Sequence, residues 1–137
     1  MDHYYSINFK KIGFDDAGYL VPIEAERNIP FAFKRIYYLF QVPVGVKRGL
    51  HSHKTLEQVL LCLHGKVTIR VAVGDKEAIF ELDDPTKGLY IGPSVWREMT
   101  DFQNAVLLVL ASDYYDEADY IRNYDQYLRY IESEGLK

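Results

Sequence analysis

Two histidines stand two residues apart in the stretch that carries the strongest chemical signal of this sequence, His51-Ser52-His53. Because side chains two apart in a β-strand lie on the same face, both imidazoles are expected to point the same way. Two neighbouring imidazoles suit either a metal ion or a proton relay, since the ordinary pKa of histidine lies near neutrality. The pair therefore predicts a metal site or an acid–base site.

The carboxylates near this pair bear on the choice between those two sites. No histidine follows His64 in the chain, so a metal would be held by His51, His53 and Glu57, with waters or with Glu98 as further ligands. Catalytic metal sites usually keep at least three protein ligands, and this set is short of histidines. A metal-free site is favoured, in which the histidines act as acid and base and Glu57 orients or charges one of them.

The elements that must position these residues are short and β-type. Turn signals recur about every ten residues over the first 110 or so positions, between runs rich in Val, Ile, Tyr and Phe, which predicts an antiparallel sandwich or barrel. The expected strands are 7–12, 19–24, 34–40, 49–53, 57–63, 66–73, 78–82, 89–91, 97–102 and 106–112. His64-Gly65 and Gly74-Asp75 are predicted to be hairpin turns. The apolar runs 60–63 and 106–110 are predicted to be central strands, covered on both faces.

The last part of the chain has a different pattern. Tyr120, Tyr124, Tyr127 and Ile131 follow one another at spacings of four, three and four, which predicts a helix over 119–132 that packs on the β-structure. The acidic residues before and at its start are expected to be solvated or to favour a helix N-terminus; they are Asp113, Asp116, Glu117 and Asp119.

Composition excludes several classes of protein. The 137 residues suffice for one domain, and 48% hydrophobic with 26% charged residues is ordinary for a globular chain. A net charge of -4 without a block of Lys or Arg argues against a nucleic-acid partner, and no apolar run is long enough for a membrane span. The first residues do not resemble a signal peptide. Cys62 is the only cysteine, so a reducing, cytoplasmic location is expected.

The histidine segment resembles the first motif of the cupin superfamily, whose members are small jelly-roll β-barrels. The pattern is Gly45, five residues, His51-x-His53, three residues and Glu57; the seven residues between Glu57 and Gly65 are one more than usual. Further runs are similar to the FdtA-type sugar 3,4-ketoisomerases, a metal-independent cupin family described as WxcM-like; they are 28–31, 34–38, 48–54, 56–60, 88–93, 95–99, 108–117 and 119–122. The expected fold is one all-β cupin domain over 1–137, with a barrel at about 5–112 and a C-terminal helical segment at about 114–133.

This resemblance implies an activity and roles for three residues. The family converts dTDP-4-keto-6-deoxyglucose to a 3-keto-6-deoxyhexose by tautomerisation through an enediolate. By resemblance His51 is the catalytic base, His53 shuttles a proton between the two oxygens, and Tyr37 is the acid. No redox cofactor is needed, and neither a G-x-G-x-x-G motif nor a P-loop occurs.

The diphosphate of such a substrate calls for arginine, which binds it through bidentate charge-assisted bonds. Arg48 is the first candidate, with Arg35 and Arg97 behind it. Strict alternation puts Arg48 on the face opposite His51, unless a bulge at Gly49 re-aims it. Two further substrate-binding candidates come later in the chain: Trp96, which is equally suited to stack on thymine or to fill the core, and Glu98.

Other readings stay open. A 3- or 3,5-epimerase of the same sugar also begins by removing a proton beside the ketone. A non-catalytic sugar-nucleotide-binding cupin and a metal-dependent cupin oxygenase are the further alternatives, and the configuration at C4 of the product is undecided. Resemblance also implies a homodimer, with exchange of N-terminal strands as an option, and a product that an aminotransferase uses for surface glycans.

Overall fold

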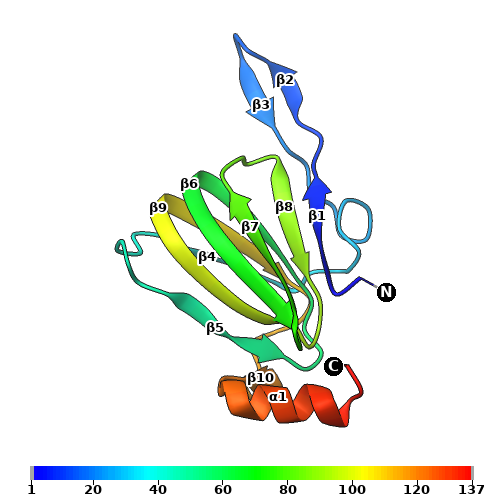
Figure 1. Cartoon of the computed structure of the whole chain (residues 1–137). Coiled ribbons are helices and arrows are strands. Elements are labelled where there is room, and N and C mark those ends of the chain that lie inside the picture. The colour runs from blue at the N-terminus through cyan, green and yellow to red at the C-terminus, as the bar shows by residue number, and fades with distance from the viewer. Residues whose placement is uncertain (1, 137) are drawn as a thin grey trace.

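Two strands of sixteen residues, β6 (Gln58–Val73) and β9 (Trp96–Ala111), pair antiparallel through the centre of the computed structural model (Figure 1). The structure describes residues 2–136. The register between these strands shifts near Cys62 to Thr68, where they curve. Their two halves therefore belong to two different sheet layers.

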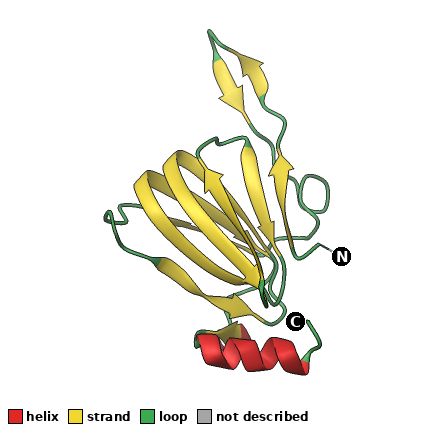
Figure 2. Cartoon of the chain, in the orientation of Figure 1, coloured by secondary structure: helices red, strands yellow, loops and turns green. Residues whose placement is uncertain are grey.

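In each layer, further strands pair with one half of β6 and one half of β9 (Figures 1 and 2). The first layer adds β1 (Tyr4–Asn8), β8 (Lys87–Ile91) and β4 (Arg35–Leu39). The second adds β7 (Lys76–Leu82), β5 (Arg48–His53) and β10 (Tyr120–Ile121). A separate hairpin of β2 (Ile12–Phe14) and β3 (Gly18–Leu20) projects from the body. The predicted all-β fold with a short C-terminal helix is confirmed, as a jelly roll whose barrel is not closed.

The predicted hairpin turn at His64-Gly65 is wrong, because β6 continues through it. Gly65 has φ of +73°, and a Cβ there would lie 2.2 Å from the Gln103 carbonyl oxygen, so only glycine fits where β9 comes this close. Opposite it, Asp101 and Asn104 also have positive φ. What the sequence presents as turns are irregularities within two continuous strands. The second predicted turn, Gly74-Asp75, does connect β6 to β7.

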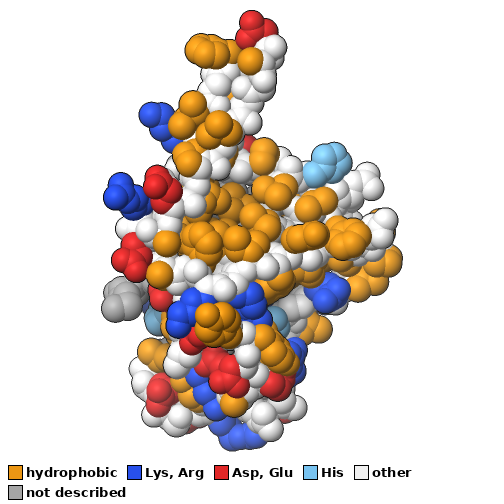
Figure 3. Space-filling model, turned by 180° about the vertical axis from the view of Figure 1, so that it is seen from behind, with side chains coloured by type: hydrophobic (Ala, Val, Ile, Leu, Met, Phe, Trp, Pro, Cys, Tyr) orange, Lys and Arg blue, Asp and Glu red, His pale blue; other side chains and the backbone are white. Residues whose placement is uncertain are grey.

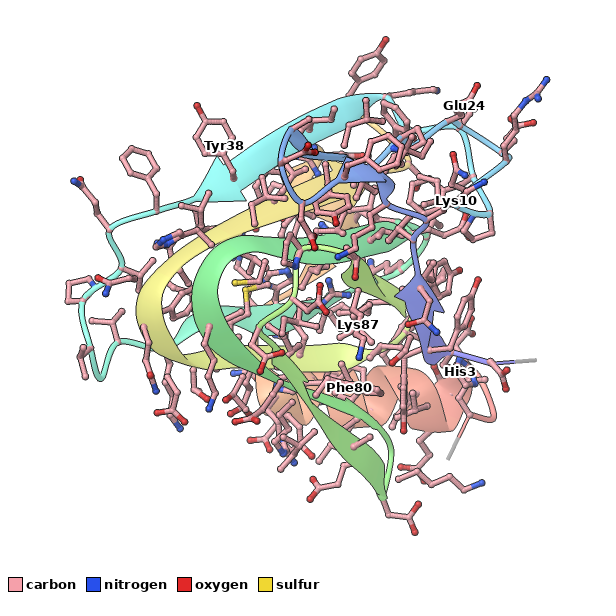
Figure 4. The ribbon with its side chains drawn as sticks, turned by 90° about the horizontal axis from the view of Figure 1, so that it is seen from above. His3, Lys10, Glu24, Tyr38, Phe80 and Lys87 are labelled. Atoms are coloured by element: carbon pink, nitrogen blue, oxygen red, sulfur yellow. The ribbon has the colours of Figure 1, made fainter. Side chains whose placement is uncertain are left out.

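Alternation along the central strands fills two separate cores. Leu60 and Leu107 belong to the core between the layers, whereas Leu61 and Leu110 belong to a second cluster on the outer face of the first layer. The outer cluster also includes Phe31, from the segment that follows β3. The prediction that both faces of these strands are covered is therefore confirmed for most of the two runs and wrong for Leu63, which is exposed. The outer face of β4 is not covered in this way, and Tyr38 projects from it (Figure 4).

The helix α1 (Tyr124–Ser133) is shorter than predicted, because the Asn123 side chain caps it by accepting from the Gln126 backbone N–H. Tyr127 and Ile131 are buried against the outer face of the second layer. The Tyr127 hydroxyl lies 2.8 Å from the Ser94 carbonyl oxygen and 3.0 Å from that of Ala72, and it donates to them. No helix among the described residues is long and apolar enough to cross a membrane.

Candidate active site

The inner face of β5 carries both histidines, as their spacing predicts. His51 is 8% exposed and His53 is completely buried. Their rings meet edge to face, with centroids 4.7 Å apart. Two imidazoles are thus held side by side at the inner surface of the jelly roll.

A bulge brings Arg48 to the same side as His51. The pairing of β5 with β9 shifts register between Arg48 and His51, and Gly49 between them has φ of +71°. This conformation is open to glycine at little cost, and the extra residue re-aims the side chain before it. The bulge that was required for Arg48 to reach the site is present, and Arg48 lines one pocket with His51.

Tyr37 reaches the site from β4 through a chain of polar contacts. The Gln58 side-chain amide donates to the Tyr37 hydroxyl over 2.9 Å, and the Gln58 carbonyl oxygen accepts a hydrogen bond from Arg97. Burial raises the pKa of Tyr37, although Arg97 opposes the shift. Tyr37 is therefore protonated at neutral pH and can donate a proton.

Arg97 is a completely buried cation. Its Nε and Nη2 atoms have no hydrogen-bond partner within residues 2–136. Burial lowers its pKa to about 10, so the guanidinium stays charged at neutral pH. A buried charge without an oppositely charged partner destabilises the folded state. Arg97 at this position therefore indicates a functional role.

Burial and this cation together keep both histidines neutral. Burial lowers the pKa of His51 to about 3, with Arg97 and Arg122 adding to the effect. The pKa of His53 is lowered further by burial and then by Arg97 and His51. A neutral imidazole has a free lone pair, so each is available as a base at neutral pH.

Tyr120 was not predicted to belong to the site. It pairs with His53 across β10 and β5, and its ring centroid lies 5.0 Å from that of His51 and 4.2 Å from that of His53. Its ring also faces the Arg122 guanidinium, whose central carbon is 4.3 Å from the ring centroid. The helical spacing of the tyrosines hides this role, since Tyr120 lies in a strand before the helix begins.

A cavity of about 400 Å³ opens beside this group; His51 lines it, whereas His53 lines a smaller pocket of about 40 Å³ that shares Arg35 and Tyr120 with it. The walls of the larger cavity include Tyr37, His51 and Tyr120 together with three arginines, Arg35, Arg48 and Arg122. No Asp or Glu is part of this lining among the described residues. A cavity of this size suits a small ligand, and its positive charge suits an anionic one.

Two predicted substrate-binding residues lie elsewhere. Trp96 and Glu98 flank Arg97 on β9, so alternation turns both away from the histidines. Trp96 is buried under α1 against Tyr127. The Glu98 carboxylate accepts from Arg70 over 3.1 Å. The prediction that these two side chains contact substrate is therefore corrected.

Glu57 does not orient either histidine, contrary to the expectation from the motif. Its carboxylate accepts a hydrogen bond from the Tyr90 hydroxyl over 2.7 Å, in the outer cluster of the first layer. Among residues 2–136 no group of three or more His, Cys, Asp or Glu side chains is arranged to hold a metal ion. The functional groups that this site does bring together are imidazoles, a phenol and guanidinium groups.

The depressed histidine pKa values predict acid sensitivity of the fold. Between pH 6.5 and about 3 an unfolded His51 takes up a proton that the folded chain refuses, so the free energy of unfolding falls as pH falls through this window. The expected slope is about 1.4 kcal/mol per pH unit for each such histidine. Urea denaturation at several pH values measures it, and His51→Asn should remove its share. An unchanged slope in that variant would contradict the lowered pKa.

Comparison with known proteins identifies the family. The model of the family described as FdtA, WxcM-like, C-terminal matches residues 2–132. The chain belongs to this family. It is also 54% identical over 134 residues to the TDP-4-oxo-6-deoxy-alpha-D-glucose-3,4-oxoisomerase of Aneurinibacillus thermoaerophilus, which covers 96% of this chain and 94% of the relative.

Solved structures agree with this assignment to the WxcM-like family. The H51N mutant of the 3,4-ketoisomerase QdtA from Thermoanaerobacterium thermosaccharolyticum, in complex with TDP-4-keto-6-deoxyglucose, has a TM-score of 0.94 and 52% identity, covering 100% of this chain and 99% of that one. The sugar epimerase NovW from Streptomyces spheroides, at 18% identity and a TM-score of 0.72, covers 87% of this chain and 68% of that one and shares the fold. The predicted family is confirmed, and ketoisomerisation is favoured over epimerisation. This WxcM-like protein is an isomerase.

Proposed function

We propose that this protein moves the ketone of TDP-4-keto-6-deoxyglucose from C4 to C3. The single observation that carries the proposal is a cavity whose wall holds the neutral His51, the phenol of Tyr37 and three arginines, with the neutral His53 packed against His51. The relatives named above bind or act on this sugar nucleotide. An acid–base set next to an anion-binding wall is what this reaction needs.

His51 removes the proton from C3, which is acidic because it lies beside the ketone. The C3–H bond breaks, its electron pair forms the C3–C4 double bond, and the negative charge develops on the C4 oxygen. The buried guanidinium of Arg97 supplies a fixed positive charge close to the histidines, in surroundings that screen it poorly. This charge lowers the barrier to enediolate formation and keeps His51 in its basic form.

His53 then carries a proton between the two oxygens. It accepts the hydroxyl proton of C3 and donates it to the oxygen on C4, which turns the C3 oxygen into the new carbonyl. Tyr37 delivers a proton to C4, because burial keeps its hydroxyl protonated. The proton that His51 took from C3 passes through solvent to the Tyr37 phenolate, which restores both side chains. The reaction involves no net oxidation, so it needs no redox partner.

The arginines of the wall hold the diphosphate. Arg48 lies on the bulge next to His51, while Arg35 and Arg122 come from other elements of the same pocket. Arg48 and Arg35 supply the charge for the anion, while Arg122, which pairs with Glu117 through Nε and Nη2, supplies its remaining N–H donors. Arg97 is too deeply buried for this role and acts on the sugar end. The nucleoside then lies toward the outside of the cavity.

A homodimer is part of the proposal. The β2–β3 hairpin extends beyond the body and exposes Phe14 and Leu20, and β4 exposes Tyr38. Hydrophobic side chains also gather on the rear face (Figure 3). Apolar surface of this kind is stabilised by a second copy, to which the hairpin can extend. A cytoplasmic location, based on the one free cysteine, stays a prediction.

The molar mass in solution tests the dimer. Light scattering is expected to give twice the mass of one chain, and the double variant Phe14→Asp with Leu20→Asp is expected to shift the protein toward the monomer. Ile79→Asp is the matched control, since Ile79 is equally exposed but lies on β7. A wild-type protein with the mass of one chain would contradict the proposed assembly.

The position of the ketone tests the reaction. The protein is mixed with TDP-4-keto-6-deoxyglucose carrying carbon-13 at C4, and the labelled carbon is followed by NMR. The carbonyl signal of C4 is expected to give way to that of a carbon bearing a hydroxyl. A C4 carbonyl that persists while other centres invert would replace isomerisation by epimerisation.

A further inference from the structure

We propose that Asp119 is a positioning residue, which holds the proton of His53 on Nδ1 and so leaves Nε2 free to move the proton between the sugar oxygens. This rests on the proposed function for its chemical consequence. Asp119 ends the short 3-10 helix Glu117–Asp119, directly before β10, in the acidic segment that was predicted to be solvated or to favour a helix N-terminus.

The Asp119 carboxylate is fixed by backbone and side-chain donors. Its Oδ1 accepts from the Thr55 backbone N–H over 2.8 Å and from the Thr55 hydroxyl over 2.9 Å. Its Oδ2 accepts from the Leu56 N–H over 3.2 Å. The Asp119 carbonyl oxygen also accepts from the Lys54 N–H over 2.9 Å. The side chain is therefore clamped to the segment that directly follows His53.

The clamp leaves one oxygen turned toward the histidine. Oδ2 lies 3.5 Å from Nδ1 of His53 and still has acceptor capacity beyond its bond to Leu56. Both ring nitrogens of His53 are buried and have no hydrogen-bond partner within residues 2–136. A contact slightly longer than a hydrogen bond is common in unliganded sites and tightens when charge develops. Asp119 is thus placed to accept a hydrogen bond from Nδ1–H.

The charges around His53 explain why such a partner is needed. The groups that disfavour its protonation come from β4, β5, β9 and the residue after β10; they are Arg35, His51, Arg97 and Arg122. The carboxylate of Glu117 is engaged by Arg122. Among the described residues, the carboxylate in ion-pair contact with His53 is that of Asp119. It stabilises the short-lived imidazolium that the shuttle step requires.

The tautomer decides which nitrogen reacts. With a proton on Nδ1 the lone pair of Nε2 accepts the C3 hydroxyl proton: the O–H bond breaks, the Nε2–H bond forms, and the imidazolium carries the charge. The Nε2–H bond then breaks as the oxygen on C4 is protonated. With the proton on Nε2 instead, this lone pair is missing at the start. Removal of the C3 proton by His51 does not depend on this choice.

Asp119→Asn tests the proposal, because its amide can donate to Nδ1 and thereby favour the wrong tautomer. In D2O the variant is expected to lose about 10²-fold or more in ketone transfer, the cost of disturbing a positioned proton-transfer group. The rate of deuterium exchange into C3 of the remaining substrate is expected to stay within about threefold of the wild-type rate, because the substitution affects His51 only indirectly. Asp113→Asn is the matched control: it removes the same charge from an exposed acid of the same segment, which pairs with Lys34, so both rates should stay near wild type.

Nitrogen-15 NMR of His53 in the unmodified protein gives a second readout, which needs no variant to fold. Protonated Nδ1 is the expected result, and a neutral His53 protonated on Nε2 would overturn the proposal. So would an Asp119→Asn variant in which exchange and ketone transfer fall together. A wild-type protein that shows neither exchange nor ketone transfer, yet carries the Nδ1 proton, would contradict the proposed function and leave the Asp119–His53 contact standing.

Discussion

Replacing His51 by asparagine is expected to lower kcat/KM for ketone transfer by about 10³- to 10⁴-fold, in the upper range of what a general base contributes. Asparagine fills a similar volume and still forms hydrogen bonds, but it cannot take up a proton. His51 is neutral and nearly buried beside Arg97, so its lone pair is available without competition from solvent. Exchange of the C3 proton with solvent should disappear together with the reaction.

Binding provides the control for this variant. TDP affinity, measured by calorimetry, is expected to change by about threefold or less, because the arginines that hold the diphosphate are untouched. His64→Asn is the matched substitution, since His64 is exposed and contacts the Asn104 carbonyl oxygen, away from the pocket. A His51→Asn enzyme that keeps more than a tenth of the wild-type rate would show that another residue removes the C3 proton.

Replacing His53 by asparagine is expected to separate the two halves of the reaction. Ketone transfer should fall by about 10²- to 10³-fold, since the proton no longer moves between the oxygens. His51 still removes the C3 proton, so deuterium from solvent should keep entering C3 of the unreacted substrate within about tenfold of the wild-type rate. The ratio of exchange to product therefore rises steeply in this variant.

Proton NMR in D2O measures both rates in one sample, through the loss of the C3 proton signal and the appearance of product. Near-ultraviolet circular dichroism checks the fold, because His53 is completely buried. If exchange and product formation fall by the same factor, His53 acts before or during removal of the C3 proton. That result would contradict its assignment as the shuttle between the oxygens.

The β-type fold and the shared face of His51 and His53 could be predicted because both depend on a period of two, which is local. The continuity of β6 and β9 could not, since Gly65 and Asn104 look like turn residues in isolation. Only the close approach of β6 and β9 shows that Gly65 permits a local irregularity within a continuous strand. Local propensity indicates where the chain bends and does not reveal whether the strand continues.

Only part of the active site could be predicted, because the rest depends on strand pairing between segments that are distant in sequence. Tyr120 and Arg122 reach it through the pairing of β10 with β5, which joins segments distant in sequence. Trp96 was a candidate to stack on thymine and Glu98 a further substrate-binding candidate, and the register that turns them outward is set by the pairing of β9 with β6 and β5. Asp119 resembled a surface acid because its donors, at Thr55 and Leu56, are remote along the chain.

Deuterium incorporation into the product tests the central claim most directly. The protein is incubated with TDP-4-keto-6-deoxyglucose in D2O, with His51→Asn in parallel, and the sugar is followed by NMR. The account predicts a product with its ketone at C3 and deuterium at C4, and no product from the variant. A sugar that keeps its ketone at C4 while deuterium enters C3 or C5 of an inverted product, or a substrate that stays unlabelled despite bound TDP, would contradict it.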